Sequence, residues 1–140
     1  MADVGAAGPM AIVERLLEAT NRHDLDAIGA CFELDFENLT PLHPARSFRG
    51  RVQVMKNWGQ ILRGVPDIST QIVGRAVEGD QVWTEWEMTG TRLDGDRQLL
   101  RGVMIFAVRA GLISSVRFYL EPVDDSSQAI DEAVAQVAGR

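Results

Sequence analysis

The chain has 140 residues, 46% of them hydrophobic, and a formal net charge of −6. This length predicts one domain with its own core, and an acidic chain without clustered Lys and Arg is not expected to bind nucleic acid. The apolar runs are too short to span a membrane, and residues 1–10 lack the basic and apolar regions of a signal peptide.

The first third of the chain is predicted to be helical after a disordered start over residues 1–8. From Pro9 the apolar spacing predicts a helix that ends near residues 21–24. Its buried face is expected to carry Val13, Leu16, Leu17 and Thr20. Asp24 is placed to cap a second, short helix over residues 25–32.

A short strand, a loop and a third helix are predicted next. The strand covers residues 36–41 and ends at a proline, and the loop covers residues 42–50. The third helix covers residues 51–65, with an apolar stripe formed by Met55, Trp58, Ile61, Leu62 and Val65.

The period of the apolar pattern then changes from that of a helix to that of a strand. Short turns separate four predicted strands, over residues 67–78, 81–93, 98–108 and 112–122. A last amphipathic helix is predicted within residues 126–140, on Ile130, Val134 and Val137. Helices followed by antiparallel strands indicate an α+β fold, with a pocket between the helices and the sheet.

This order of elements, with the stretches NRHDLDAIGACF, FRGRVQVMKNWGQIL, VPDISTQIV, VWTEWEMTGT and RAGLISSVRFYLEP, resembles the SnoaL-like branch of the nuclear transport factor 2-like superfamily. The resemblance covers residues 9–123 and leaves residues 124–140 as a C-terminal helix or tail. It implies a cone-shaped barrel, usually dimeric, in which N-terminal helices cover the concave face of a curved, mainly antiparallel sheet. The superfamily holds ketosteroid isomerase, limonene epoxide hydrolase and polyketide cyclases, so the fold alone does not decide a function.

Most catalytic positions of these enzymes correspond to residues without acid or base chemistry in this chain. For ketosteroid isomerase, the resemblance relates the oxyanion-binding Tyr to Leu16, the general-base Asp to Thr40 and the protonated Asp to Met104. The acid of the SnoaL-type cyclase falls at Phe118.

Limonene epoxide hydrolase gives a similar result. Its catalytic Arg and Asp fall at Trp86 and Met88, and its second Asp again falls at Phe118. Phe36 replaces a Tyr of that enzyme, and Asn38 matches an Asn. The resemblance therefore implies an apolar, aromatic-walled pocket.

The strand over residues 81–93 has two different faces. Trp86 and Met88 lie on one face, and Glu85 and Glu87 lie on the other. An unpaired buried carboxylate is very costly, so the glutamates are expected outside, paired across strands with Arg101 and Arg117. This outer face, with Trp83, Val103, Ile105 and Tyr119, is also predicted to form a homodimer.

His43 is the strongest candidate for catalysis. It lies between Pro41 and Pro44 in a loop expected at the pocket mouth, where an imidazole could act as general acid or base. The alternative is a passive surface histidine. Asn38 and Asn57 are candidates for positioning a substrate, and Glu121 for reaching the pocket rim.

Two functions of different classes stay open. The first is binding of a hydrophobic small molecule by Leu16, Phe36, Thr40, Trp58, Trp86, Met88, Met104, Phe106 and Phe118. The second is a cofactor-independent isomerase, cyclase or epoxide hydrolase that uses His43. A weaker third is a protein-interaction module that docks through the C-terminal helix.

Neither a metal site nor a cofactor is predicted. The two histidines have no cysteine or carboxylate at ligand spacing, which argues against a metal. Cys31 is the single cysteine, so no internal disulfide can form, and a reducing, cytoplasmic location is expected. Cys31 itself is expected to be inert packing.

Overall fold

The computed structural model describes residues 8–139, so the predicted disorder of residues 1–8 falls almost entirely outside the described residues. The helical elements are α2 (Met10–Asn21), α3 (Leu25–Gly29), the 3-10 helix η1 (Pro44–Arg46), α4 (Arg51–Gly64) and α5 (Ile130–Val137). The strands are β1 (Phe32–Leu39), β2 (Phe48–Arg49), β3 (Ser69–Glu78), β4 (Gln81–Thr91), β5 (Arg97–Arg109) and β6 (Leu112–Pro122).

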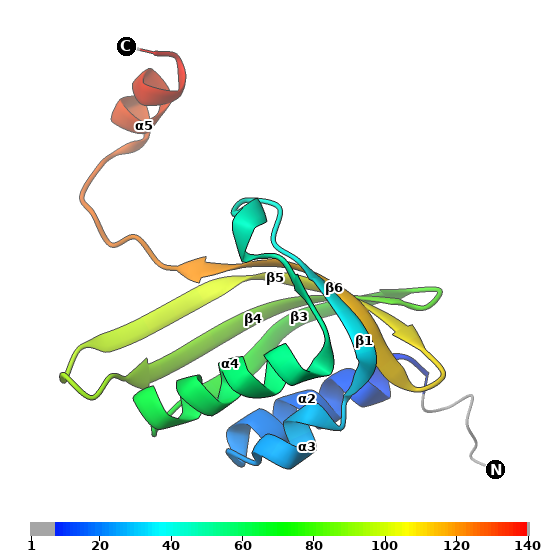
Figure 1. Ribbon diagram of the computed structural model, residues 1–140. Helices are drawn as coiled ribbons and strands as arrows, with labels where there is room; N and C mark the ends of the chain where they lie inside the picture. The colour runs from blue at the N-terminus through cyan, green and yellow to red at the C-terminus, as the bar shows by residue number, and fades with distance from the viewer. Residues whose placement is uncertain (1–7, 140) are drawn as a thin grey trace.

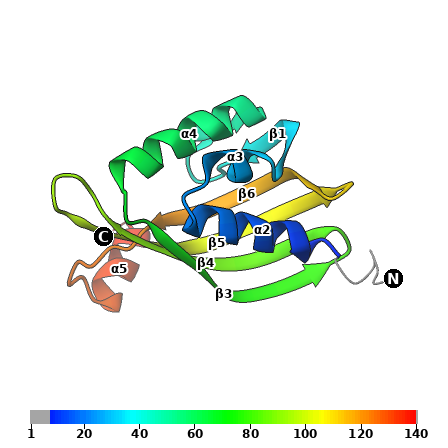
Figure 2. The ribbon, with the colours of Figure 1, turned by 90° about the horizontal axis from the view of Figure 1, so that it is seen from below.

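Within the described residues the strands form one curved sheet in the order β2-β1-β6-β5-β4-β3 (Figure 1). Neighbouring strands are antiparallel except β1 and β6, which run parallel. Helices α2, α3 and α4 lie together over its concave face (Figure 2). The predicted α+β class, with a curved, mainly antiparallel sheet under N-terminal helices, is confirmed. The sheet is unclosed, since β2 and β3 are its two edges.

The first helix docks on the sheet through its apolar face and its C-terminal end. Val13 and Leu16 are buried, as their spacing predicted. At the end of α2, the Asn21 side chain donates to the carbonyl of Thr70 at 3.0 Å and accepts from its N–H at 2.8 Å. Asp24 caps α3 by accepting from the N–H of Ala27 at 3.0 Å, as predicted. The two bonds of Asn21 hold the end of α2 against β3.

The β1 strand begins at Phe32, four residues earlier than predicted, and α3 is correspondingly shorter. Short apolar runs do not distinguish helix from strand by periodicity. Long-range pairing decides here, because the Cys31 carbonyl accepts from the N–H of Ile113 at 2.9 Å. The ring of Phe32 also packs edge-on to that of Phe36, with centroids 4.7 Å apart.

The two faces of β4 are as predicted. Trp86 and Met88 are buried against the helices, and Glu85 is exposed on the other face. Glu87 accepts a 2.7 Å hydrogen bond from Arg101 across the β4–β5 ladder. Arg117 departs from the prediction, since it stacks over the ring of Trp83 at 5.9 Å instead of pairing with a glutamate. The positive end of this side chain therefore meets an aromatic face.

The C-terminal helix is present but lies apart from the domain (Figure 1). Its apolar residues Ile130, Val134 and Val137 are 74%, 53% and 91% exposed. Among residues 8–139 there is no helix with the length and apolar character needed to cross a membrane.

Candidate functional site

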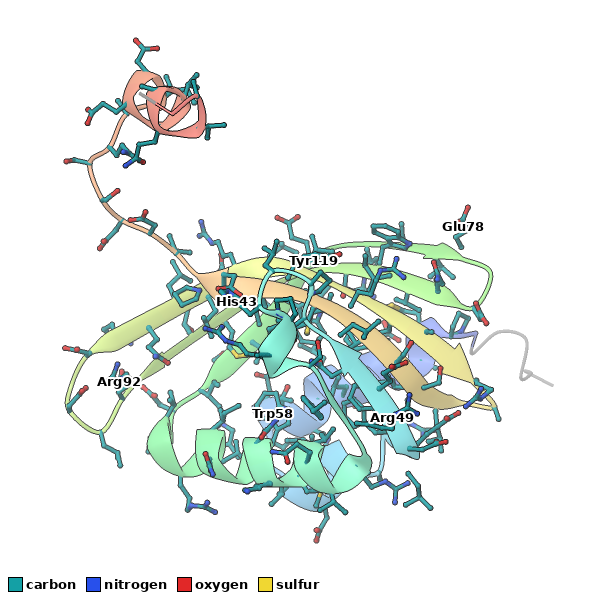
Figure 3. The ribbon with its side chains drawn as sticks, turned by 45° about the horizontal axis from the view of Figure 1, so that its top comes forward. His43, Arg49, Trp58, Glu78, Arg92 and Tyr119 are labelled. Carbon is teal, nitrogen blue, oxygen red and sulfur yellow. The ribbon has the colours of Figure 1, made fainter. Side chains whose placement is uncertain are left out.

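A cavity of about 300 Å³ lies between the helices and the concave face of the sheet. Most of its lining side chains are aromatic or aliphatic: Leu16, Phe32, Phe36, Phe48, Val54, Trp58, Ile61, Met88, Leu100, Met104, Phe106, Val116, Phe118 and Leu120. The remaining lining residues are Asn38, Thr40, Arg46 and Asn57. Figure 3 shows Trp58 on the side of α4 that faces the sheet. The cavity is thus an apolar chamber with few polar groups.

The structure brings most of the predicted ligand-binding residues to this wall, from four strands and two helices. These are Leu16, Phe36, Thr40, Trp58, Met88, Met104, Phe106 and Phe118. The strands supply them by alternation, which turns every second side chain toward the helices.

Trp86 faces inward but is not one of the lining residues. It is 1% exposed, and its indole N–H donates to the hydroxyl of Thr84 at 2.6 Å. Thr84 in turn donates to the carbonyl of Met104 at 2.7 Å. The indole also packs against Phe106, with ring centroids 6.2 Å apart. Trp86 therefore supports the wall from behind.

Sequence reasoning missed two lining residues in the predicted loop of residues 42–50. Phe48 and Arg46 fell in this predicted loop, which in fact contains η1 and β2. The signal for η1 was Pro44, a residue favoured in a first helical turn. The sequence gives a weaker indication of β2, because a strand of two residues is too short to show an alternating apolar pattern. Phe48 reaches the wall because β2 pairs with β1, with Phe48 opposite Asn38.

The polar side of the cavity is built at the end of β1, where Asn38 lies on the strand and Thr40 directly follows it. Asn38 and Thr40 are 7% and 4% exposed, and the Asn38 amide donates to the Thr40 hydroxyl at 2.9 Å. The side-chain oxygen of Asn38 takes no part in this bond, and the Thr40 hydroxyl is the acceptor in it and so keeps its own proton to donate. An acceptor and a donor are thus available to a ligand. On the facing helix, Asn57 accepts from Gln53 at 2.7 Å.

The structure joins two of the predicted catalytic residues, His43 and Glu121. The His43 Nε2 lies 3.2 Å from a carboxylate oxygen of Glu121, and the two side chains are 38% and 33% exposed. Figure 3 shows His43 above η1, beside the sheet. Neither residue belongs to the cavity wall. The pair ties the loop after β1 to the end of β6.

Cys31 lies in the turn between α3 and β1, at 3% exposure and away from the large cavity. Burial raises the pKa of its thiol above the ordinary value. The thiol contacts the Ala27 carbonyl at 3.4 Å. A buried thiol with a raised pKa is a poor nucleophile, which agrees with a packing role. In the part of the chain that the structure describes, no three His, Cys, Asp or Glu side chains gather as a metal-binding group.

Residues 13–116 match the family model described as the SnoaL-like domain. No functionally curated protein matches the sequence.

Solved structures with the same fold include three whose proposed activities differ. A proposed SnoaL-like polyketide cyclase from Jannaschia sp. CCS1 has a TM-score of 0.69 and 19% identity, covering 81% of this chain and 85% of its own. AclR, a proposed hydroxylase from Streptomyces galilaeus, has a TM-score of 0.73 and 18% identity, covering 94% and 92%. A proposed ketosteroid isomerase from Kribbella flavida DSM 17836 has a TM-score of 0.67 and 17% identity, covering 86% and 83%. At these identities the likeness shows the fold alone.

Proposed function

The chain belongs to the SnoaL-like domain family, and we propose that it binds a hydrophobic small molecule in the cavity between α4 and the sheet. The observation that carries this proposal is the cavity of about 300 Å³ with a mainly aromatic and aliphatic wall. Natural ligand sites combine such walls with a few polar groups that orient the ligand. Asn38 and Thr40 are those groups here.

The binding energy would come mainly from apolar contact. Burial contributes roughly 25 cal/mol per Å² of apolar surface, so a ligand with a ring system gains more from the wall than from one hydrogen bond. Phe36, Phe106 and Phe118 would contact the body of the ligand, and the Asn38–Thr40 pair would select its orientation.

The test uses neighbouring residues on opposite faces of β6. Phe118 lines the cavity, whereas Tyr119 lies on the alternate register of the strand. We expect Phe118→Ala to weaken binding of neutral apolar ligands, such as a β,γ-unsaturated ketone or an aromatic polyketide ester, by about tenfold. Tyr119→Ala should leave their affinity unchanged. Titration calorimetry measures both, and native mass spectrometry of the purified protein identifies a retained ligand. Equal losses in the two variants would place the binding site elsewhere.

A second candidate, catalysis by His43, is favoured by its contact with Glu121. An imidazole held by a carboxylate is the arrangement that orients general bases in many enzymes. Against it, neither side chain lines the cavity. The binding role is therefore preferred.

Turnover of epoxides, β,γ-unsaturated ketones and aromatic polyketide esters distinguishes the two roles. A catalytic His43 predicts that His43→Ala lowers turnover about a hundredfold or more, with little change in affinity for the substrate. Activity on any of these substrates that survives the substitution would remove His43 from the mechanism. Asn38 and Asn57, which do line the cavity, would then be the next residues to replace.

A further inference from the structure

Arg46 is the one residue with a charged side chain among the described residues that line the cavity. It lies on η1 and is exposed to solvent, so this residue is at the mouth of the chamber. No Asp or Glu belongs to the wall. An anionic ligand in this site would therefore be attracted by Arg46 and would not be repelled by a carboxylate in the wall.

Within residues 8–139 the Arg46 guanidinium has no carboxylate partner and no hydrogen-bond acceptor. Its neighbours in sequence differ. Arg49 pairs with Glu37 at 3.3 Å, and Arg51 donates twice to the carbonyl of Phe32, at 2.9 and 3.1 Å. Arg46 thus retains its full donor capacity, in a fork that matches a carboxylate.

The backbone that carries Arg46 is held at several points. The N–H of Arg46 donates to the carbonyl of His43 at 2.8 Å, and the N–H of Thr40 donates to the hydroxyl of Ser47 at 3.0 Å. The contact between His43 and Glu121 adds a tie to β6. These bonds hold the backbone of residue 46 close to the end of β1, where Asn38 and Thr40 lie.

We infer that the ligand is a hydrophobic molecule bearing a carboxylate, with its apolar body in the cavity and its anionic group on Arg46. This inference rests on the proposed binding function and names the ligand class of that same site. A charge-assisted, two-pronged hydrogen bond from an arginine is among the stronger polar contacts available. The chain as a whole carries a net charge of −6, which repels anions. The positive charge of Arg46 offsets this repulsion at the mouth of the cavity. In this arrangement His43 is a positioning residue that holds the loop of Arg46.

The experiment compares three probes with one apolar body: 1-naphthaleneacetic acid, its primary amide and 2-(1-naphthyl)ethylamine. Their affinities are measured by titration calorimetry at pH 7 for the wild-type protein, Arg46→Gln and Arg49→Gln. Arg49→Gln is the matched control, because it removes the same charge from an arginine three residues away that does not line the cavity.

We expect the wild-type protein to bind the acid about tenfold more tightly than the amide, and the amine least. Arg46→Gln should remove the preference for the acid while leaving the affinity for the amide unchanged, and Arg49→Gln should keep the preference. Equal binding of acid and amide by the wild-type protein would overturn the inference and leave the proposed binding function standing. Loss of the preference for the acid in Arg49→Gln would also overturn the inference and leave the proposed binding function standing. Failure of all three probes to bind would overturn both.

Discussion

Gly102 shows how a single residue shapes the wall of the cavity. It lies on β5 between Trp86 of β4 and Leu120 of β6. A Cβ atom at this position would collide with the carbonyl of Tyr119 and lie 2.8 Å from the Cα of Leu120. The strands can therefore approach this closely only because residue 102 has no side chain.

Gly102→Ala is predicted to lower the free energy of unfolding by about 3 kcal/mol, because backbone atoms of β6 would have to move. Urea denaturation followed by tryptophan fluorescence measures the change. Gly64→Ala is the control, since nothing lies within 4 Å of a Cβ there and the residue is in a helix. It should be neutral or slightly stabilising. A Gly102→Ala variant as stable as Gly64→Ala would contradict the role given to Gly102.

At the scale of elements, α5 differs from α2, α3 and α4 in having no buried residue. Its apolar residues are exposed, and the segment that joins it to β6 lies away from the sheet. A helix of eight residues is marginal by itself in water, because nucleation is costly and few backbone bonds offset it. The element therefore adds little to the stability of the domain.

We predict that truncation after Val123 leaves the thermal midpoint of unfolding within about 2 °C of the full chain, because no core contact is lost. Differential scanning calorimetry measures it. A chain that ends after Phe118 is the control. It loses Leu120, which is 6% exposed, and the partner of His43, so it should unfold cooperatively at a much lower temperature or not fold. A large loss of stability on removal of residues 124–140 alone would show that α5 is part of the domain.

At the scale of the whole molecule, the sheet has one face covered by helices and one face without them. The uncovered face carries Trp83, 42% exposed, with Arg117 stacked on it. Ile105 lies between Trp83 and Arg117 on this face, as the cross-strand partner of both. A mixture of aromatic, aliphatic and arginine side chains is typical of protein interfaces. We propose that two copies of the chain associate through this face.

The wild-type protein is predicted to sediment as a dimer at ten micromolar. Trp83→Glu should shift it to the monomer, because a charge at the centre of an interface is costly to bury. Leu93→Glu, in the exposed β4–β5 turn, is the control and should leave the dimer intact. Sedimentation velocity measures all three. A wild-type monomer at this concentration would contradict the proposal.

The sequence by itself determined the type of each major element and the direction of most side chains. Alternation is a local property of a strand, so the inward direction of Met88, Met104 and Phe118 followed from their positions, as did the outward direction of Glu85. The cap formed by Asp24 is local for the same reason, because donor and acceptor are three residues apart.

The tertiary structure alone decided where β1 begins, how η1 and β2 form and which side chains complete the cavity. The partners that decide these features are far apart in sequence: Cys31 and Ile113 pair across 82 positions, and His43 and Glu121 across 78. No local sequence pattern encodes such a pairing, since it depends on which strands are neighbours in the finished sheet. Arg46 reaches the cavity mouth for that reason, because the sheet brings its loop over the chamber.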